Sequence, residues 1–144
     1  MKKTKVINII AGPGVGKSVL ASQIFTYMKV KGYNIEFIGE YAKELVYHKE
    51  FELLNNQHYV SFKQREMLKL FDGKVDYIVT DGSILHGLAY NILHKKNVSN
   101  IKRTKKKILE YYYEFENITI FLERNIEYRY EQDGRIQDLD GAIE

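Results

Sequence analysis

The stretch from residue 5 to residue 25 constrains the fold more than any other part of the chain. It opens with an apolar run of strand length, residues 5–11, and continues through the string GPGVGKS into apolar positions at helical spacing. A buried strand that ends at glycines and is followed by a helix is typical of a parallel α/β sheet. The glycines let successive backbone N–H groups face one anion, and the helix N-terminus adds its positive dipole end. The sequence therefore predicts a phosphate-binding loop.

The residue types in this loop match those of a P-loop. We expect Lys17 to reach the β- and γ-phosphates of ATP, and the Ser18 hydroxyl to join a Mg²⁺ ion. The strict pattern has glycine at its first position, where this chain has Ala11. The alternative is a glycine-rich turn with an incidental Lys-Ser pair. The predicted cofactor-binding residues are Gly12, Pro13, Gly14, Val15, Gly16, Lys17, Ser18 and Val19.

Strands and helices alternate along the rest of the chain. The pattern predicts strands over residues 5–11, 35–38, 75–80 and 118–122, and helices over 17–31, 41–47, 57–71, 84–94 and 100–115, with a loop over 50–56. This alternation indicates an open α/β fold with right-handed crossovers, a three-layer α/β/α arrangement. We expect a single domain over residues 1–144, with a charged flap at about 123–137.

Composition excludes some classes of protein. With no cysteine, the chain has neither disulfides nor a thiolate metal site, which fits a cytoplasmic location. The apolar run near the N-terminus is too short for a signal peptide or a membrane span. A net charge of +3, from 22 Lys and Arg against 19 Asp and Glu, does not demand a polyanionic partner. The basic run at residues 102–107 is interpreted as a solvated helix face, with a nucleic-acid patch as the alternative.

Acidic residues follow two of the predicted strands. Asp81 ends the third strand, where a carboxylate can hold Mg²⁺ through water; the alternative is an N-cap for the next helix. Glu40 ends the second strand, and ligands in open α/β sheets bind outside the carboxyl ends of the strands. Glu40 could accept a proton from an attacking hydroxyl or hold the sugar of an acceptor, or be only an exposed acid at a helix start.

Three arginines follow the fourth strand: Arg124, Arg129 and Arg135. Guanidinium groups on a flap can close over a transferring phosphoryl group and neutralise its charge. Each arginine taken singly is also an ordinary surface ion-pair residue. We expect at least one of them to touch phosphate and list all three as candidate catalytic residues beside Lys17 and Glu40.

The acceptor side of the site is expected on the helices that follow the second strand. Arg65 could take an acceptor phosphate and Gln64 could read a base edge; a polar helix face is the alternative for both. Tyr41 and Tyr90 each lie on a helix after a strand-end acid and are candidate substrate-binding residues. The four histidines show no metal-ligand spacing and are given ordinary polar or core roles.

Taken together, the loop, the Glu40-Tyr41-Ala42-Lys43 string, Asp81 and the segment from Tyr130 to Arg135 resemble a small P-loop kinase. The chain is similar to the AAA-domain group that includes ribosylnicotinamide kinases and phage-encoded nucleotide kinases. The resemblance implies a nucleoside monophosphate kinase-like fold with a parallel sheet of order 2-3-1-4-5. The residues after Arg135 are too few for the last helix and strand, so a sheet lacking its last strand is expected, unless the sequence stops early.

Several reactions are open to such a chain. The leading hypothesis is phosphotransfer from ATP to a small nucleoside or nucleoside monophosphate. The alternatives are an ATPase or switch acting on a protein or nucleic-acid partner, and a polynucleotide end kinase. The oligomeric state stays open, with a homodimer as one possibility.

Overall fold

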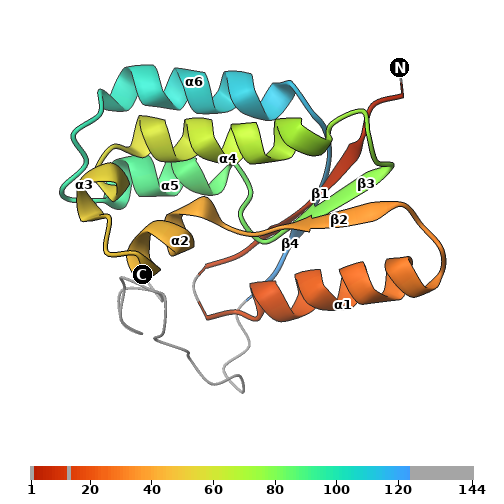
Figure 1. Ribbon diagram of the computed structural model, residues 1–144. Helices are drawn as coiled ribbons and strands as arrows, with labels where there is room; N and C mark the ends of the chain where they lie inside the picture. Colours follow the sequence, from red (N-terminus) through yellow and green to blue (C-terminus); the bar gives the residue numbers. More distant parts are fainter. Residues whose placement is uncertain (1, 13, 124–144) are drawn as a thin grey trace.

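The computed structural model describes residues 2–12 and 14–123, which form a parallel sheet covered by helices on both faces (Figure 1). Within these residues the sheet has four strands in the order β2-β3-β1-β4. All pairings are parallel, with Lys5 opposite Tyr77 on one side and Glu116 on the other. The strands are β1 (Lys5–Ile10), β2 (Ile35–Ile38), β3 (Tyr77–Thr80) and β4 (Glu116–Phe121). This order confirms the predicted order for the strands described.

The helices form the outer layers. They are α1 (Lys17–Val30), α2 (Tyr41–Tyr47), α3 (Phe51–Leu54), α4 (Gln57–Phe71), α5 (His86–Leu93) and α6 (Ile101–Tyr113). Figure 1 shows α1 on one face of the sheet and α4, α5 and α6 stacked on the other. None of these helices, taken over the described residues, has the length and apolar character needed to cross a membrane.

Alternate residues of β1 supply the two cores. Val6 packs with Ile78 and Ile108 under α4 and α6, whereas Ile7 and Ile9 pack against α1. Because neighbouring residues of a strand point to opposite faces, a strand covered on both sides has apolar residues at consecutive positions, as β1 has on either side of the buried Asn8. The three-layer α/β/α fold is therefore the one that the sequence predicts.

The structure differs from the predicted elements at a few places. Residues 50–56, expected as a loop, contain the short helix α3, because Leu54 packs into a cluster with Leu45 and Val60. β3 begins at Tyr77 rather than at Val75, because its pairing with Lys5 of β1 and Ile35 of β2 begins at Tyr77. The carboxyl ends of β2 and β3 are as predicted, at Ile38 and Thr80, and those of β1 and β4 each lie one residue earlier.

Candidate active site

The phosphate-binding loop has the backbone that its glycines predict. Gly14 and Gly16 have φ angles of 76° and 92°, in the left-handed region that side chains disfavour. Val15 between them is buried, and the Gly16 carbonyl accepts the first helical hydrogen bond, from Leu20. Lys17 and Ser18 therefore open α1 at its N-terminus, where the backbone N–H groups are free for an anion.

Ser18 and Asp81 meet at this edge of the sheet, as the sequence predicts for a metal pair. The Ser18 hydroxyl donates a 2.7 Å hydrogen bond to Asp81 Oδ2. The other carboxylate oxygen, Oδ1, is buried without a partner. A buried carboxylate oxygen without a partner fits a water-bridged Mg²⁺ ion. The alternative role of Asp81 as a helix cap is not observed, because Ser83 Oγ accepts the Leu85 N–H at the start of α5.

The rest of a metal shell would come from solvent and phosphate. In the described part of the chain, no three His, Asp or Glu side chains gather so that they could hold a metal ion by themselves. Mg²⁺ ordinarily keeps several waters and is held by one or two protein groups together with substrate phosphates. The Ser18 and Asp81 oxygens fit that mode of binding.

Lys17 and Glu40 lie close together between the loop and the end of β2. The Lys17 Nζ is 3.6 Å from Glu40 Oε2, and the two side chains are 13 % and 19 % exposed. An ion pair whose side chains are largely buried interacts more strongly than one in bulk water. The structure thus brings the predicted phosphate-binding lysine and the predicted acid from β2 into one site.

Gln64 holds the turn in which Glu40 lies. Its amide oxygen accepts from the Tyr41 N–H (2.8 Å), and its amide nitrogen donates to the Gly39 carbonyl (2.9 Å). Both amide groups are therefore used on the main chain at either side of Glu40. Gln64 lines the pocket and positions Glu40; its second N–H and second lone pair leave the predicted contact with a base edge as a prediction.

The turn after β3 lies against the same acid. A β-carbon at Gly82 would be 2.5 Å from the Glu40 α-carbon, a distance that real atoms do not reach. The Gly82 N–H donates to Thr80 Oγ1 (2.9 Å), which fixes the turn. Glycine at this position allows the ends of β2 and β3 to approach closely.

A small pocket opens beside Glu40, between α2, α4 and α5. Its volume is about 20 Å³. Its floor is made of neutral polar side chains of α4, among them Gln57, Ser61 and Gln64, all at most 5 % exposed. Tyr90 lines it from α5, so this predicted substrate residue faces the pocket.

His86 is the site residue that the sequence did not single out. It lines the pocket from the start of α5, and its Nε2 lies 3.5 Å from the Ala11 N–H, the first residue of the loop. Burial, and then the charge of Lys17, lower the pKa of His86 to about 3. Its Nδ1 is buried without a partner. The sequence gave no signal for this residue, because its contact with Ala11 joins positions far apart in the chain.

Arg65 is turned away from this site, which differs from the prediction. Its guanidinium makes a bidentate contact with the Glu114 carboxylate, at 2.6 and 3.1 Å, and stacks over the Tyr111 ring. Since adjacent positions of a helix point about 100° apart, Gln64 and Arg65 cannot both face the pocket. Arg65 joins α4 to α6 in place of the acceptor phosphate contact that the sequence predicted.

Tyr41, a predicted substrate-binding residue, packs against another aromatic side chain. Its ring packs edge-to-face on Tyr59 of α4, with centroids 6.2 Å apart, and the two hydroxyls are 3.4 Å apart. Burial, followed by the contact with Tyr59, raises the pKa of Tyr41 to about 12. Tyr41 is a packing residue of the α2–α4 contact and does not line the pocket.

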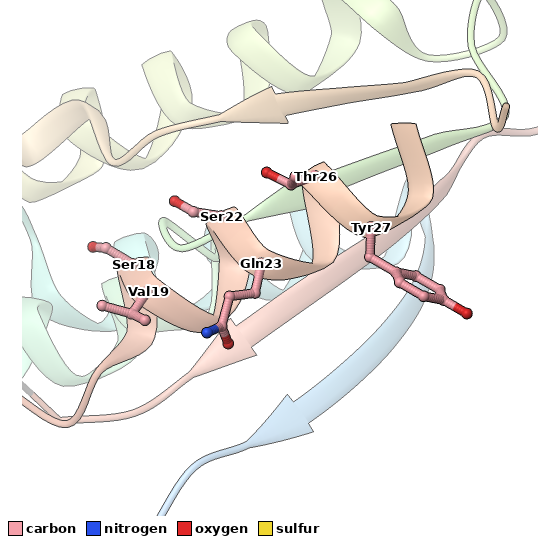
Figure 2. A pocket seen from close by; sticks show the side chains of 6 residues that line it. All are labelled: Ser18, Val19, Ser22, Gln23, Thr26 and Tyr27. Atoms are coloured by element: carbon pink, nitrogen blue, oxygen red, sulfur yellow. The ribbon is translucent and has the colours of Figure 1, made fainter. Parts of the chain in front are cut away.

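Val19 lies on the outer side of α1, beside an open hollow of about 590 Å³ (Figure 2). Figure 2 shows its lining on one helix: Ser18, Val19, Ser22, Gln23, Thr26 and Tyr27. Val19 itself is 60 % exposed. A hollow lined by a single helix does not enclose a ligand, so only its Ser18 end belongs to the phosphate site.

Some predicted residues lie outside the described part of the chain. They are Pro13, Arg124, Arg129, Arg135 and, apart from Glu123, the flap at residues 123–137. The basic run at 102–107 is described and belongs to α6, where Lys102, Arg103, Lys105 and Lys106 are exposed.

The sheet order, the glycine loop at the end of β1 and the Ser18–Asp81 contact define a P-loop NTPase fold. No protein-family model matches the chain, and no curated protein matches it. Among solved structures, the chain is similar to the crystal structure of a DNA replication initiation factor, with 20 % identity and a TM-score of 0.35. That match covers 84 % of this chain and 32 % of the other, so this chain spans about a third of its length. A likeness at that level carries no conclusion about activity.

Proposed function

We propose that this protein transfers the γ-phosphoryl group of Mg²⁺-ATP to a small acceptor of the nucleoside or nucleotide kind, as the small P-loop kinases that it resembles do. The observation that carries the proposal is the pocket beside Glu40. Glu40 lines this pocket and also pairs with Lys17, so one acid is shared by the phosphate-binding loop and the pocket proposed for the acceptor. A concave pocket lined by a few placed polar groups is the usual form of a small-molecule site.

The residues on the donor side have defined roles in this proposal. The loop N–H groups and Lys17 bind the β- and γ-phosphates, for which Lys17 leaves Glu40. Ser18 and Asp81 hold Mg²⁺, which would neutralise charge on the phosphates when bound. Glu40, released from its ion pair, is then free to act as a base.

The residues on the acceptor side orient the nucleophile. Gln64 and Gly82 keep Glu40 at the mouth of the pocket, where its carboxylate takes the proton from the attacking oxygen. Holding the two reactants in line supplies much of the rate in phosphoryl transfer. The flap arginines are proposed to neutralise charge on the transferring phosphoryl group, as the sequence suggests.

The test is the dependence of ADP formation on an acceptor. The full chain is incubated with Mg²⁺-ATP and a panel of nucleosides and nucleoside monophosphates, and both ADP and phosphorylated product are measured. We expect ADP to form only with certain acceptors, in equal amount with product. Equal ADP release in water alone would instead support the ATPase or switch that the sequence left open.

A further inference from the structure

The charges around the pocket restrict the chemical class of the phosphate acceptor. This inference rests on the proposed function. Twelve residues line the pocket, and among these described residues none is a lysine or an arginine. The one charged group is the carboxylate of Glu40. Arg65, which could have offered a cation from α4, is bound to Glu114 on the side of α6. Lys17, the cation paired with Glu40, is bound to the phosphates of ATP in the proposed function, so the phosphate dianion of an acceptor would meet an acid and no cation among the described lining residues.

The hydrogen-bonding groups of the uncharged lining residues also favour an acceptor without a phosphate. The amide nitrogen of Gln57 donates to the Leu54 carbonyl (2.7 Å), which leaves its Oε1 as a buried acceptor without a partner. Such an oxygen can be satisfied by a hydroxyl or an N–H of a ligand, whereas a phosphate oxygen has no hydrogen to give. Two of the acceptor groups of the pocket, Glu40 and Gln57, thus call for a ligand that donates.

His86 supplies a donor without a partner. A neutral imidazole has one donor nitrogen and one acceptor nitrogen. Because Nε2 accepts from the Ala11 N–H, the proton is on Nδ1, which is buried and unpaired. The lowered pKa of His86 keeps the ring neutral, so it offers a hydrogen bond without a positive charge.

We propose that the pocket beside Glu40 selects an uncharged acceptor of the nucleoside or polyol kind and rejects acceptors that already carry a phosphate. In the reaction, the acceptor oxygen bonds to the γ-phosphorus of ATP, and its proton passes to the Glu40 carboxylate. The bond from the γ-phosphorus to the bridging oxygen breaks, and ADP leaves with that electron pair. Gln57 and His86 hold the other polar groups of the acceptor.

The first experiment compares matched pairs of acceptors. The full chain with Mg²⁺-ATP is given adenosine or AMP, cytidine or CMP, and thymidine or dTMP, with ribose as a simple polyol, and product is measured by mass spectrometry. We expect kcat/KM for at least one uncharged acceptor to exceed that of its monophosphate roughly 100-fold, since charge mismatch and lost hydrogen bonds act together. Monophosphates that react as well as their nucleosides would overturn the inference and leave the proposed function intact. No product from any acceptor would overturn both.

The second experiment adds a charge to the pocket. Ala42 lines the pocket from α2, whereas Ala89 lies exposed on α5 and is not part of the lining. We expect Ala42→Arg to shift the ratio of monophosphate to nucleoside activity roughly tenfold toward the monophosphate, because the new guanidinium offsets Glu40. The matched control Ala89→Arg adds the same charge elsewhere and should leave the ratio unchanged. Equal ratios in both variants would contradict selection by charge.

Binding of the acceptor measured without ATP tests the inference independently of turnover. Nucleoside and monophosphate are titrated into the nucleotide-free protein by calorimetry, for the natural chain and for Gln57→Met. We expect the nucleoside to bind more tightly than its monophosphate, and Gln57→Met to weaken nucleoside binding about tenfold through the lost acceptor. Tighter binding of the monophosphate would overturn the inference.

Discussion

Gly82 lies directly against the main chain of Glu40, at a distance that leaves no room for a side chain. A β-carbon there would be 2.5 Å from the Glu40 α-carbon and 3.0 Å from its amide nitrogen. The ends of β2 and β3, which are far apart in the sequence, therefore meet through their backbones. Glu40, which pairs with Lys17 and lines the pocket, is held by this contact.

Replacing Gly82 should move Glu40 without removing it. We expect Gly82→Ala to reduce acceptor-dependent ADP formation about 100-fold, because a displacement of about 1 Å at the reacting groups has that effect. The matched control is Gly39→Ala, since a β-carbon at Gly39 meets nothing within 4 Å. Steady-state kinetics on both folded variants make the comparison. Equal activity of the two would show that the close approach has no role in the reaction.

Removing the charge of Glu40 tests its role as a base. We expect Glu40→Gln to reduce kcat by 10²- to 10⁴-fold, the usual contribution of a positioned general base. ATP binding should be retained or improved, because Lys17 loses its competing partner. Glu44→Gln, on the exposed side of α2, is the control. Turnover close to that of the natural chain in Glu40→Gln would exclude a base at this position.

Asp81 should set the dependence on Mg²⁺. In Asp81→Asn the oxygen that accepts from Ser18 can remain, while the unpaired Oδ1 becomes an amide nitrogen that cannot hold a metal-bound water as an acceptor. We expect the Mg²⁺ concentration for half-maximal activity to rise about tenfold, as for loss of an outer-shell metal partner. A titration of activity with Mg²⁺ measures it, with the surface variant Asp76→Asn as control. An unchanged Mg²⁺ requirement would place the metal elsewhere.

His86 should make stability depend on pH. Its pKa lies at about 3 in the folded chain and near 6.5 when unfolded, so the unfolded chain binds more protons between these values. Stability from this group is complete above pH 6.5 and falls as the pH drops toward 3. We expect the free energy of unfolding of the natural chain to fall by about 2 kcal/mol more than that of His86→Asn between pH 7 and pH 5.

Urea unfolding of both chains at pH 7, 6 and 5 provides the measurement. The pKa values of His58 and His94 are also lowered by burial, so both chains keep some dependence on pH. The difference between the chains isolates His86. Parallel curves would mean that His86 has the same pKa folded and unfolded.

Arg65 and Glu114 should contribute to stability and not to acceptor binding. The pair is bidentate and partly buried, with side chains 22 % and 31 % exposed. We expect a double-mutant cycle of Arg65→Ala and Glu114→Ala to give a coupling of about 1 kcal/mol. The KM for the acceptor should stay within about twofold of the natural value. A large rise in that KM with unchanged stability would show that Arg65 takes part in acceptor binding.

Local patterns predicted most of the helices and strands and their order along the chain. The apolar runs of β1 and β3 and the helical spacing in α4 depend on residues close in the chain, so they could be recognised there. β4 begins two residues earlier than predicted, at Glu116, because β1 pairs with it from Lys5 onward. Boundaries of this kind are set by the neighbouring strand and not by the local sequence.

By itself the sequence determined the phosphate loop, because Gly14, Gly16, Lys17 and Ser18 act through a backbone shape that adjacent residues define. It also indicated that Glu40 and Asp81 end strands at the same edge of a sheet. Only the tertiary structure decided that Glu40 reaches Lys17 and that Gln64 holds the turn around Glu40. It also decided that His86 contacts Ala11 and that Arg65 pairs with Glu114. Each of these contacts joins residues from different elements, and their geometry follows from how α4 and α5 pack on the sheet.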